Sequence, residues 1–356
     1  MQVVNSPPVT AQDKVIDTAF YVLDPAELNK AERHVPYSLE TLQTLSPNHL
    51  ALMELRDHAD LAILEKCYGA FAALSPAWLD FRRELHMTDD KDLFLEKEAP
   101  GLLPLYQGKM IWQYTAYYDK SEYWLDPGAF DERTHSKELY RMGQDLGVTR
   151  TEATKHASAV RFDREFVRLG VREIARDTDE RTLIFTLLPK NIGIGHKVNF
   201  STPKIYVRSA DGGVTTQAVS PLRLLFSLAW FNSVPVDWLA RFMIQISVSK
   251  TYLHRLPMPQ PTDDEIRANP DFSQLAKNAL LLSLAASWDD FAELAPLFDV
   301  QPRDLPKTAK AQDTLRAQND QLVARLYGIT DAELAHLLRS FKVMASKRPE
   351  YLTLLA

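Results

Sequence analysis

The sequence REFVRLGVREIARDTDERTLIFTLLP, residues 164–189, decides how the middle of this chain folds. From Val167 to Arg172, apolar residues alternate with arginine or glycine, and a period of two is typical of a half-buried β-strand. A polar turn at residues 177–180 follows. Residues 181–188 predict a second strand, which Pro189 ends because proline has no N–H to donate to a sheet. We therefore predict an antiparallel hairpin with one buried face and one face that carries arginines.

The arginine-bearing face of this hairpin has two interpretations. Arginines on a strand suit contacts with the phosphates or base edges of a nucleic acid. They are also ordinary solvated surface, and the hairpin taken alone favours that second interpretation. The choice between them depends on the rest of the chain.

The charge of the chain is unevenly distributed. With 356 residues, 46% of them hydrophobic and 25% charged, the composition is that of a soluble globular protein with room for two or three cores. The net charge is −6, so any contact with nucleic acid requires a local basic patch. Residues 150–208 hold twelve Lys and Arg against seven Asp and Glu, a net charge of +5, which leaves −11 for the rest. This asymmetry favours an anionic partner.

Cysteine usage and hydropathy indicate a cytoplasmic protein without a membrane span. The single cysteine, Cys67, cannot form an internal disulfide, and its neighbours Leu64 and Tyr68 predict a buried thiol. The amino terminus shows no signal-peptide pattern. Polar residues interrupt the most apolar stretch, residues 222–246, so we expect buried helix there and no contact with a membrane.

We predict an α+β fold in three parts. Residues 1–100 form a helical, acidic amino-terminal segment, residues 101–261 a central domain of mixed or antiparallel β structure, and residues 262–356 a carboxy-terminal helical bundle. The proline-rich residues 252–261 mark the second boundary. Helix signals include Ser220-Pro221 as a start, a long polar helix at 308–327 that Gly328 ends, and a capping box beginning at Thr330.

Aromatic residues mixed with Lys and Gln, at residues 106–118, predict a binding surface beside the hairpin. Lys109, Tyr114 and Tyr117 are its candidate contact residues. The alternative is that the other large side chains here, Tyr106, Met110 and Trp112, belong to the core. Residues 191–200, NIGIGHKVNF, predict a glycine-bearing loop on the other side of the hairpin.

Catalytic motifs are missing from the sequence. The nearest approach to a cofactor-binding glycine loop, Gly193-Ile194-Gly195, is too short, and no phosphate-cradling lysine loop is present. The nine histidines lack the spacing of a zinc site. The acidic residues 89–92 have the chemistry for a cation, but a solvated loop is the favoured interpretation. We therefore predict no catalytic, cofactor-binding or metal-binding residues in this chain.

Five segments taken together resemble, in the same order, one family of proteins. They are residues 81–90 (FRRELHMTDD), 104–114 (PLYQGKMIWQY), 172–176 with 180–184 (REIAR and ERTLI), 231–238 (FNSVPVDW) and 253–259 (LHRLPMP). Each is weak alone. Together they are similar to the target recognition region that follows the catalytic domain in type II restriction-modification adenine-N6 DNA methyltransferases, or in fused restriction enzymes.

The resemblance implies a domain that docks in the major groove of double-stranded DNA. A separate catalytic domain, in cis or in trans, would bind S-adenosylmethionine and methylate an extruded adenine, as part of a phage-defence system. This chain lacks the cofactor motif of that family. Asn5-Ser6-Pro7-Pro8-Val9 is similar to its Asn-Pro-Pro-aromatic motif, but Val9 has no ring to stack on an extruded base. Because both motifs are missing, the resemblance implies recognition without chemistry. Trp112 also departs from the histidine usual at its position.

The predicted DNA contacts follow from the basic hairpin and the resemblance. Phosphate contacts are expected from Arg164, Arg168, Arg172, Arg176, Lys197 and Lys250. Base reading is expected near Thr178, Glu180, Arg181 and His196. An alternative stays open for Glu180-Arg181-Thr182, which would serve equally well as an internal ion pair that locks the turn without touching DNA.

Two other functions have weaker support. The chain would serve as a protein-interaction scaffold or specificity subunit if the polar helix at residues 308–327 pairs with a partner subunit. An intact enzyme of another type has the least support, because no nucleophile, metal cluster or cofactor loop is visible.

Overall fold

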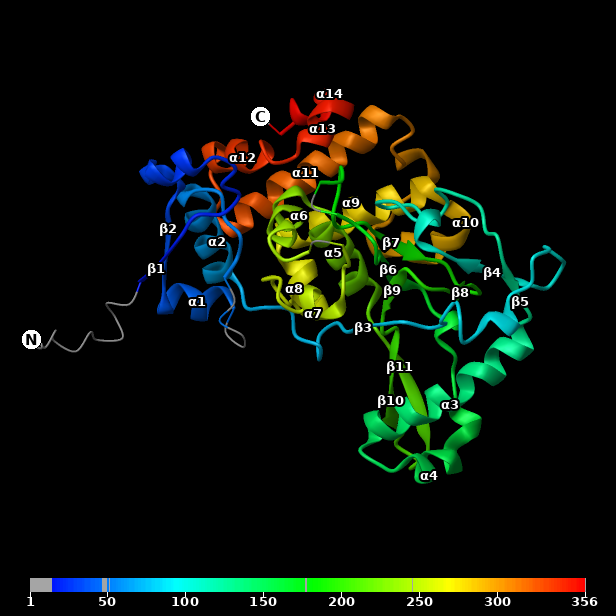
Figure 1. Ribbon diagram of the computed structural model, residues 1–356. Coiled ribbons are helices and arrows are strands. Elements are labelled where there is room, and N and C mark those ends of the chain that lie inside the picture. Colours follow the sequence, from blue (N-terminus) through cyan, green and yellow to red (C-terminus); the bar gives the residue numbers. More distant parts are fainter. Residues whose placement is uncertain (1–14, 47–49, 51, 177, 245, 356) are drawn as a thin grey trace, which may run out of the picture.

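A computed structural model describes residues 15–46, 50, 52–176, 178–244 and 246–355 (Figure 1). Within these residues the protein has the predicted mixed α+β fold, with helices near both ends of the chain, a two-stranded sheet near the amino terminus and the other small sheets in the middle. The helices are α1 (Leu39–Leu45), α2 (His58–Ala70), α3 (Pro127–Leu146), α4 (Arg150–Ala153), α5 (Pro221–Phe231), α6 (Val234–Arg241), α7 (Lys250–Leu253), α8 (Asp263–Ala268), α9 (Pro270–Ala286), α10 (Trp288–Phe291), α11 (Ala309–Tyr327), α12 (Asp331–Leu338), α13 (Lys342–Lys347) and α14 (Pro349–Leu352). The strands are β1 (Val15–Thr18), β2 (Val35–Ser38), β3 (Phe81–Arg82), β4 (Leu103–Tyr106), β5 (Trp124–Leu125), β6 (Arg168–Arg172), β7 (Phe185–Leu188), β8 (Gly193–Ile194), β9 (Val198–Ser201), β10 (Lys204–Arg208) and β11 (Val214–Ala218).

The predicted hairpin forms the centre of a four-stranded antiparallel sheet in the order β3-β9-β6-β7. Arg168 of β6 pairs antiparallel with Leu188 of β7, which confirms the hairpin, although β7 begins only at Phe185. The prediction of one exposed face is wrong, since β6 is buried on both sides up to Val171. Segments distant in the sequence cover the face that we expected to meet solvent.

Residues 191–200 are not a simple loop. They contain β8, which pairs in parallel with β4, and most of β9, which pairs with β6. The amino-terminal side of the aromatic segment and the residues after the hairpin therefore share a three-stranded sheet, in the order β5-β4-β8. This pairing brings the three predicted parts of the site into contact.

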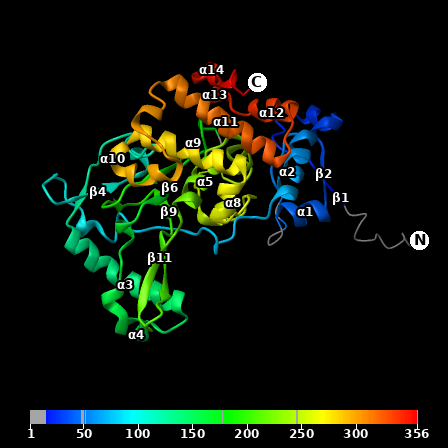
Figure 2. The ribbon, with the colours of Figure 1, turned by 180° about the vertical axis from the view of Figure 1, so that it is seen from behind.

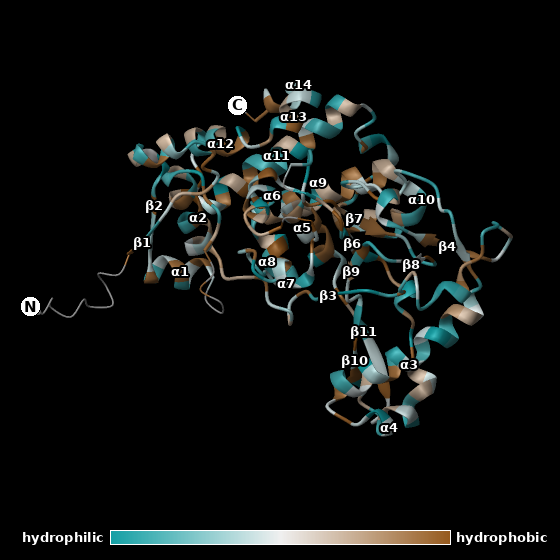
Figure 3. Ribbon diagram, viewed as in Figure 1, coloured by the Kyte–Doolittle hydropathy of each residue, from teal (hydrophilic) through white to brown (hydrophobic). Residues whose placement is uncertain are grey.

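Helix α5 covers the hairpin side of the main sheet, and α9 packs on α5. Helix α5 starts as predicted, with the Ser220 hydroxyl accepting from the Leu222 N–H and Pro221 at the first position. It packs on α9, α8, β6 and β7, and the view from behind shows α8 and α9 on the outside of it (Figure 2). The Phe185 and Phe231 rings stack 4.6 Å apart between sheet and helix. Hydrophobic residues concentrate at this junction (Figure 3).

Local helix signals are largely confirmed in the rest of the chain. Thr308 caps α11, Gly328 ends that helix in the left-handed conformation at φ 72°, and Thr330 begins a capping box at α12. Cys67 is buried in α2, as predicted. Helix α6 ends at Arg241, several residues earlier than expected.

A projecting lobe consists of α3, α4 and the β10–β11 hairpin (Figure 1). It is joined to the body by a buried ion cluster, in which Lys204 Nζ lies 2.8 Å from Glu138 Oε2 and 2.7 Å from Asp163 Oδ1. Burial alone would raise the pKa of Asp163, but Arg82, Lys204 and Arg141 hold that pKa well below its usual value. The cluster therefore uses Lys204, one of the basic residues of the 150–208 region, as internal structure.

The amino-terminal helices and the carboxy-terminal bundle lie side by side. Helix α2 packs on α11 and α12, and one hydrophobic cluster contains residues from all three predicted parts of the chain. The domain boundaries at residues 100 and 261 remain predictions. Among the described residues, no helix combines the length and the apolar character needed to cross a membrane. The motif-like residues 5–9 and Asp177 of the hairpin turn lie outside the described part.

Candidate nucleic-acid interface

Arg172, the last residue of β6, connects the hairpin to the aromatic segment. Its Nε donates to the Gly108 carbonyl at 2.8 Å, its Nη2 donates to the Ile111 carbonyl, and its guanidinium lies 5.3 Å from the centre of the Trp112 ring. Burial lowers the pKa of Arg172. Because its guanidinium group donates to two backbone carbonyls, we reassign Arg172 from a phosphate contact to a clamp, a residue that holds the turn at Gly108–Met110 in place.

Beyond the end of β6, the backbone lies between two other segments. The Glu173 N–H donates to the Lys197 carbonyl at 2.9 Å, and the Val248 N–H donates to the Glu173 carbonyl at 2.7 Å. The turn at Gly108 packs closely against the backbone of Lys197, because a Cβ atom added to Gly108 would lie 3.0 Å from the Lys197 carbonyl oxygen. The hairpin, the aromatic segment and residues 191–200 therefore meet here, as predicted.

Four exposed cations lie on the segments that meet here or within a few residues of them, and we call them the strand-end surface: Arg83, Arg176, Lys197 and Lys250. Arg83 forms an ion pair with Glu173, and Lys250 lies 3.7 Å from Asp80. Arg176 and Lys197 have no ion pair among the described residues. Their charges are therefore the most available to an incoming phosphate.

Aromatic side chains lie near this surface. The Trp112 ring is half-buried and stacks on Tyr118 at 5.4 Å, and Tyr118 is exposed. Tyr117 is also exposed, with its hydroxyl donating to Asp290. By contrast Tyr106 and Met110 are buried, so the core alternative is correct for those two residues.

The remaining exposed candidates are polar. Thr178 is exposed in the hairpin turn, and the partly exposed His196 ring lies 6.0 Å from the ring of His86. Lys109 is exposed but forms ion pairs with Glu122 and Asp119. Glu180 is held by Lys347 and Arg348 at 3.9 and 3.8 Å. Of these four candidates, Thr178 and His196 are the two without an ion pair within the described part of the chain.

Three predicted contact residues lie inside the protein or are held at its edge. Arg168 is fully buried, where it donates to Glu84 Oε1 and to the Ile192 carbonyl, each at 3.0 Å. Tyr114 is buried with its hydroxyl accepting from Asn319. Arg164 makes a two-pronged contact with Asp131, with both distances 2.7 Å. In this conformation the polar groups of all three side chains are hydrogen-bonded within the protein and are not available to DNA.

Arg181 is also buried, and it forms the internal lock. Its Nε donates to Asp237 Oδ2 at 2.9 Å, and its Nη2 donates to the Asn232 carbonyl. The Thr182 and Leu183 N–H groups donate to the same Asp237 carboxylate. Burial alone would lower the pKa of Arg181, but Asp237 outweighs this and raises it. The contacts match the lock alternative, so Arg181 leaves the set of base-reading candidates.

The lock includes a third segment of the resemblance. Gln113 donates to the Leu183 carbonyl at 3.0 Å and to the Asn232 carbonyl at 3.3 Å. The Asn232 side chain exchanges hydrogen bonds with both backbone groups of Phe185. Segments 104–114, 180–184 and 231–238 are thus joined inside the protein, where they position the surface.

Arg83 is absent from the predicted set, although it lies in the first of the five segments. Its neighbour Arg82 turns inward to Asp163 at 2.6 Å, and strand alternation places Arg83 on the opposite side. That alternation was the available signal. The acidic residues 89–92, considered for a cation, are engaged by Arg133, which contacts Asp90 and Asp92.

Comparisons with known proteins identify no family for this chain. No protein-family model matches the sequence, and no curated protein matches it. Among solved structures, one match is the Type IIL restriction-modification enzyme MmeI in complex with DNA, with a TM-score of 0.35 and 14% sequence identity over 75% of this chain. The match spans 35% of that enzyme's length.

Proposed function

We propose that this chain recognises a specific sequence in double-stranded DNA, as the target recognition part of a restriction-modification adenine-N6 methyltransferase that acts in phage defence. The observation that carries the proposal is the junction at Arg172. Two segments of the resemblance, residues 104–114 and the hairpin, converge there with residues 191–200, and exposed cations lie around their meeting point.

Each part of the surface has a role in this proposal. Arg176 and Lys197, with Lys250 and Arg83, contact backbone phosphates and set the register on the duplex. Thr178 and His196 read base edges, and the exposed Tyr118 offers a ring face for an extruded or unstacked base. The recognition domain corresponds to residues 101–261. Methylation itself, with S-adenosylmethionine, belongs to a catalytic domain that works in cis or in trans.

The overall charge of −6 sets the expected strength of binding. Four exposed cations on an acidic protein give weak, salt-sensitive affinity, because each phosphate contact contributes through the release of a counterion. Full affinity therefore requires the catalytic domain. Adding that domain in trans should tighten binding to the selected sequence.

The test is a titration of labelled duplex DNA across a salt series. The double variant Arg176→Gln with Lys197→Gln should bind about tenfold more weakly, and the slope of log affinity against log salt should fall by about 2. A matched control, Arg267→Gln with Lys277→Gln, removes two exposed charges from α8 and α9 and should bind as wild type. Equal binding by variant and control, or strong salt-insensitive binding by wild type, would contradict the proposal.

A second measurement addresses the division of labour. Incubation of the chain alone with labelled S-adenosylmethionine and mixed-sequence DNA should give no methyl transfer. Methylation by this chain alone would contradict the proposal that the chain recognises DNA without catalysing a reaction.

The alternative function, a protein-interaction scaffold, requires helix α11 to pair with a partner subunit. In the structure, α11 packs within the chain on α2, α5, α6 and α9.

A further inference from the structure

A cavity of about 420 Å³ lies between helices α2, α6, α12 and α13, away from the Arg172 junction. Four of its lining residues are cations, Arg56, Arg241, Arg339 and Lys342, and two are acids, Asp57 and Asp60. We call it the basic cavity. We propose that it binds a phosphate group. The favoured source of this phosphate is the DNA backbone, and in that case the inference rests on the proposed function.

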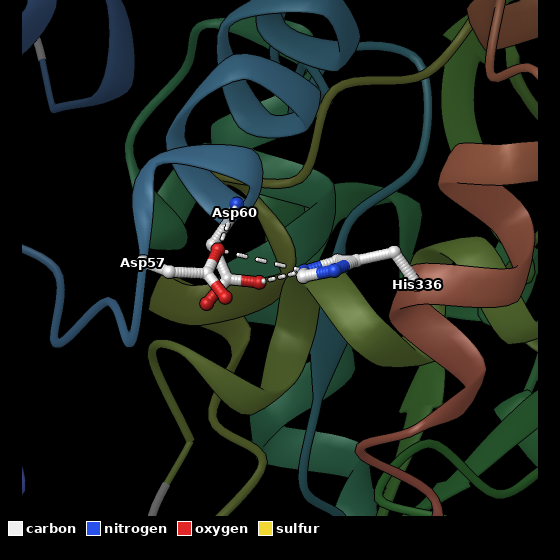
Figure 4. A group of neighbouring side chains, drawn as sticks. All are labelled: Asp57, Asp60 and His336. Carbon is white, nitrogen blue, oxygen red and sulfur yellow. Dashed lines mark hydrogen bonds and ion pairs between the residues drawn. The ribbon is translucent and has the colours of Figure 1, made fainter. Parts of the chain in front are cut away.

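The two acids of the basic cavity are already engaged by the protein. Asp57 Oδ1 accepts from the backbone N–H groups of Ala59 and Asp60, and Asp60 Oδ2 accepts from the Arg56 N–H at 3.1 Å. His336 Nε2 lies 2.9 Å from Asp60 Oδ1 and 3.7 Å from Asp57 Oδ1 (Figure 4). These contacts tie α12 to the start of α2.

The same three residues, Asp57, Asp60 and His336, have the chemistry of a metal site, and their ligand atoms lie within 4.8 Å of one another. The surroundings argue against a metal. The hydrogen bonds of the two carboxylates already account for their positions, and four cationic side chains line the same cavity. A divalent cation would be repelled by that lining, whereas an anion would be attracted.

The cations differ in how far they are already neutralised. The guanidinium group of Arg241 is already bonded within the protein, since it donates to Asp237 Oδ1 at 2.9 Å and to the carbonyls of Asp179 and Glu180. Arg339 and Lys342 are exposed and have no ion pair within the described residues. Arg56 has no carboxylate partner there either, and its guanidinium lies 4.6 Å from the Tyr21 ring. Three positive charges therefore line the cavity without a compensating acid of their own.

Phosphate is the anion that this lining fits. Guanidinium groups bind phosphate oxygens through two parallel N–H donors, and a lysine adds a point charge. The Thr178 hydroxyl, which also lines the cavity, is a further donor, whereas the Ser340 hydroxyl already donates to the Leu337 carbonyl at 2.7 Å. The combination has donors for the oxygens of a phosphate and positive charge for its negative charge.

The place of Thr178 connects the basic cavity to DNA. Thr178 belongs to the hairpin turn that follows Arg176 of the strand-end surface, and Arg241 fixes the two residues after it through their carbonyls. A duplex that contacts Arg176 and Thr178 would therefore pass the opening of the cavity. A backbone phosphate is the favoured source, and a free phosphate or nucleotide is the other source of the same chemistry.

The experiment compares Arg339→Gln with Lys342→Gln, as a double variant, with the matched control Arg303→Gln with Lys307→Gln. All four side chains are exposed, so both double variants should fold. Two properties are measured on the full chain. One is the salt dependence of duplex DNA binding, and the other is the rise in unfolding temperature when inorganic phosphate replaces chloride at equal ionic strength.

If the DNA backbone supplies the phosphate, the cavity variant binds duplex about tenfold more weakly, with a salt slope lower by 1 to 2, and the control does not change. If a free phosphate is the ligand, the variant loses the phosphate-dependent rise in unfolding temperature and keeps its DNA affinity. The inference is overturned if the variant matches the control in both measurements. Should wild type bind no DNA at all, the proposed function fails separately, and the phosphate measurement alone decides the cavity.

Discussion

Arg181 and Asp237 form an ion pair inside the protein, with 2.9 Å between Arg181 Nε and Asp237 Oδ2, and both side chains are at most 4% exposed. The pair joins the hairpin to the start of helix α6. The same carboxylate accepts from Arg241 and from two backbone N–H groups of the hairpin. The position of the turn that contains Thr178 is therefore set by α6 and by the core behind it.

Replacing Arg181 with Ala should destabilise the protein by about 3 to 5 kcal/mol, because Asp237 would remain buried with one of its cations missing. Urea denaturation followed by circular dichroism measures this. A double-mutant cycle with Asp237→Asn should give a coupling free energy of about 1 to 3 kcal/mol, as expected for residues in one network.

The control for Arg181 is Arg176→Ala, which removes an exposed arginine from the same turn region. Its stability should stay within about 0.5 kcal/mol of wild type, while its DNA affinity falls. The opposite pattern, with a stable Arg181→Ala protein that no longer binds DNA, would mean that Arg181 acts as a DNA contact.

Replacing Arg168 with Met tests whether this arginine is structural. The change leaves Glu84 buried without its cation, so a loss of about 3 to 5 kcal/mol in the free energy of unfolding is expected. Adding Glu84→Gln should recover part of that loss, because a neutral amide costs less to bury and still accepts from the Ile194 N–H. Both proteins should keep the wild-type salt slope for DNA. A lower slope with unchanged stability would restore Arg168 to the phosphate contacts.

These buried arginines explain where prediction from the sequence succeeds and where it ends. Helix caps such as Thr308 and Thr330 act on groups within three residues, so a local pattern identifies them. The hairpin itself is predicted by its alternation and its turn. Whether the arginine face meets solvent depends on distant residues: Glu84 covers Arg168 from 84 positions away, and Asp237 covers Arg181 from 56.

The sequence also predicts only part of the candidate site. The sequence patterns correctly indicate that residues 106–118, the hairpin and residues 191–200 lie together as one unit. They do not distinguish a side chain that faces DNA from one that holds the unit in place. Arg172 and Arg176 are four residues apart in the same arginine series, yet one clamps the Gly108 turn and the other is exposed. Only the packing separates their roles.

Replacing Arg172 with Lys should weaken the clamp while keeping the charge. Lysine cannot reproduce two directed N–H donors, so the carbonyls of Gly108 and Ile111 lose their partner at a cost of about 1 to 3 kcal/mol in stability. DNA affinity should fall by a similar factor at every salt concentration, since phosphate contacts are retained. The control Arg161→Lys changes an exposed ion pair with Glu165 and should have little effect. A change in salt slope would identify Arg172 as a phosphate contact.

Asp320 of α11 gives the stability of the protein a specific dependence on pH. It is buried beside the same network, where its carboxylate accepts from the Val234 N–H at 2.8 Å and from the Tyr351 hydroxyl. Burial raises the pKa of Asp320 from 3.8 to about 6, against the opposing effect of Arg181. The folded state therefore holds this proton more tightly than the unfolded state, and stability falls as pH rises from about 4 to about 6.

The variant Asp320→Asn should remove this dependence, because an amide accepts from Val234 and does not ionise. Each pKa unit corresponds to about 1.4 kcal/mol, so the difference in unfolding free energy between variant and wild type should shift by about 3 kcal/mol in favour of the variant between about pH 4 and pH 7. Urea denaturation at several pH values measures it. Asp264→Asn, whose side chain is fully exposed, is the control and should show no such shift. A difference that stays constant with pH would mean that Asp320 is ionised in the folded protein throughout this range.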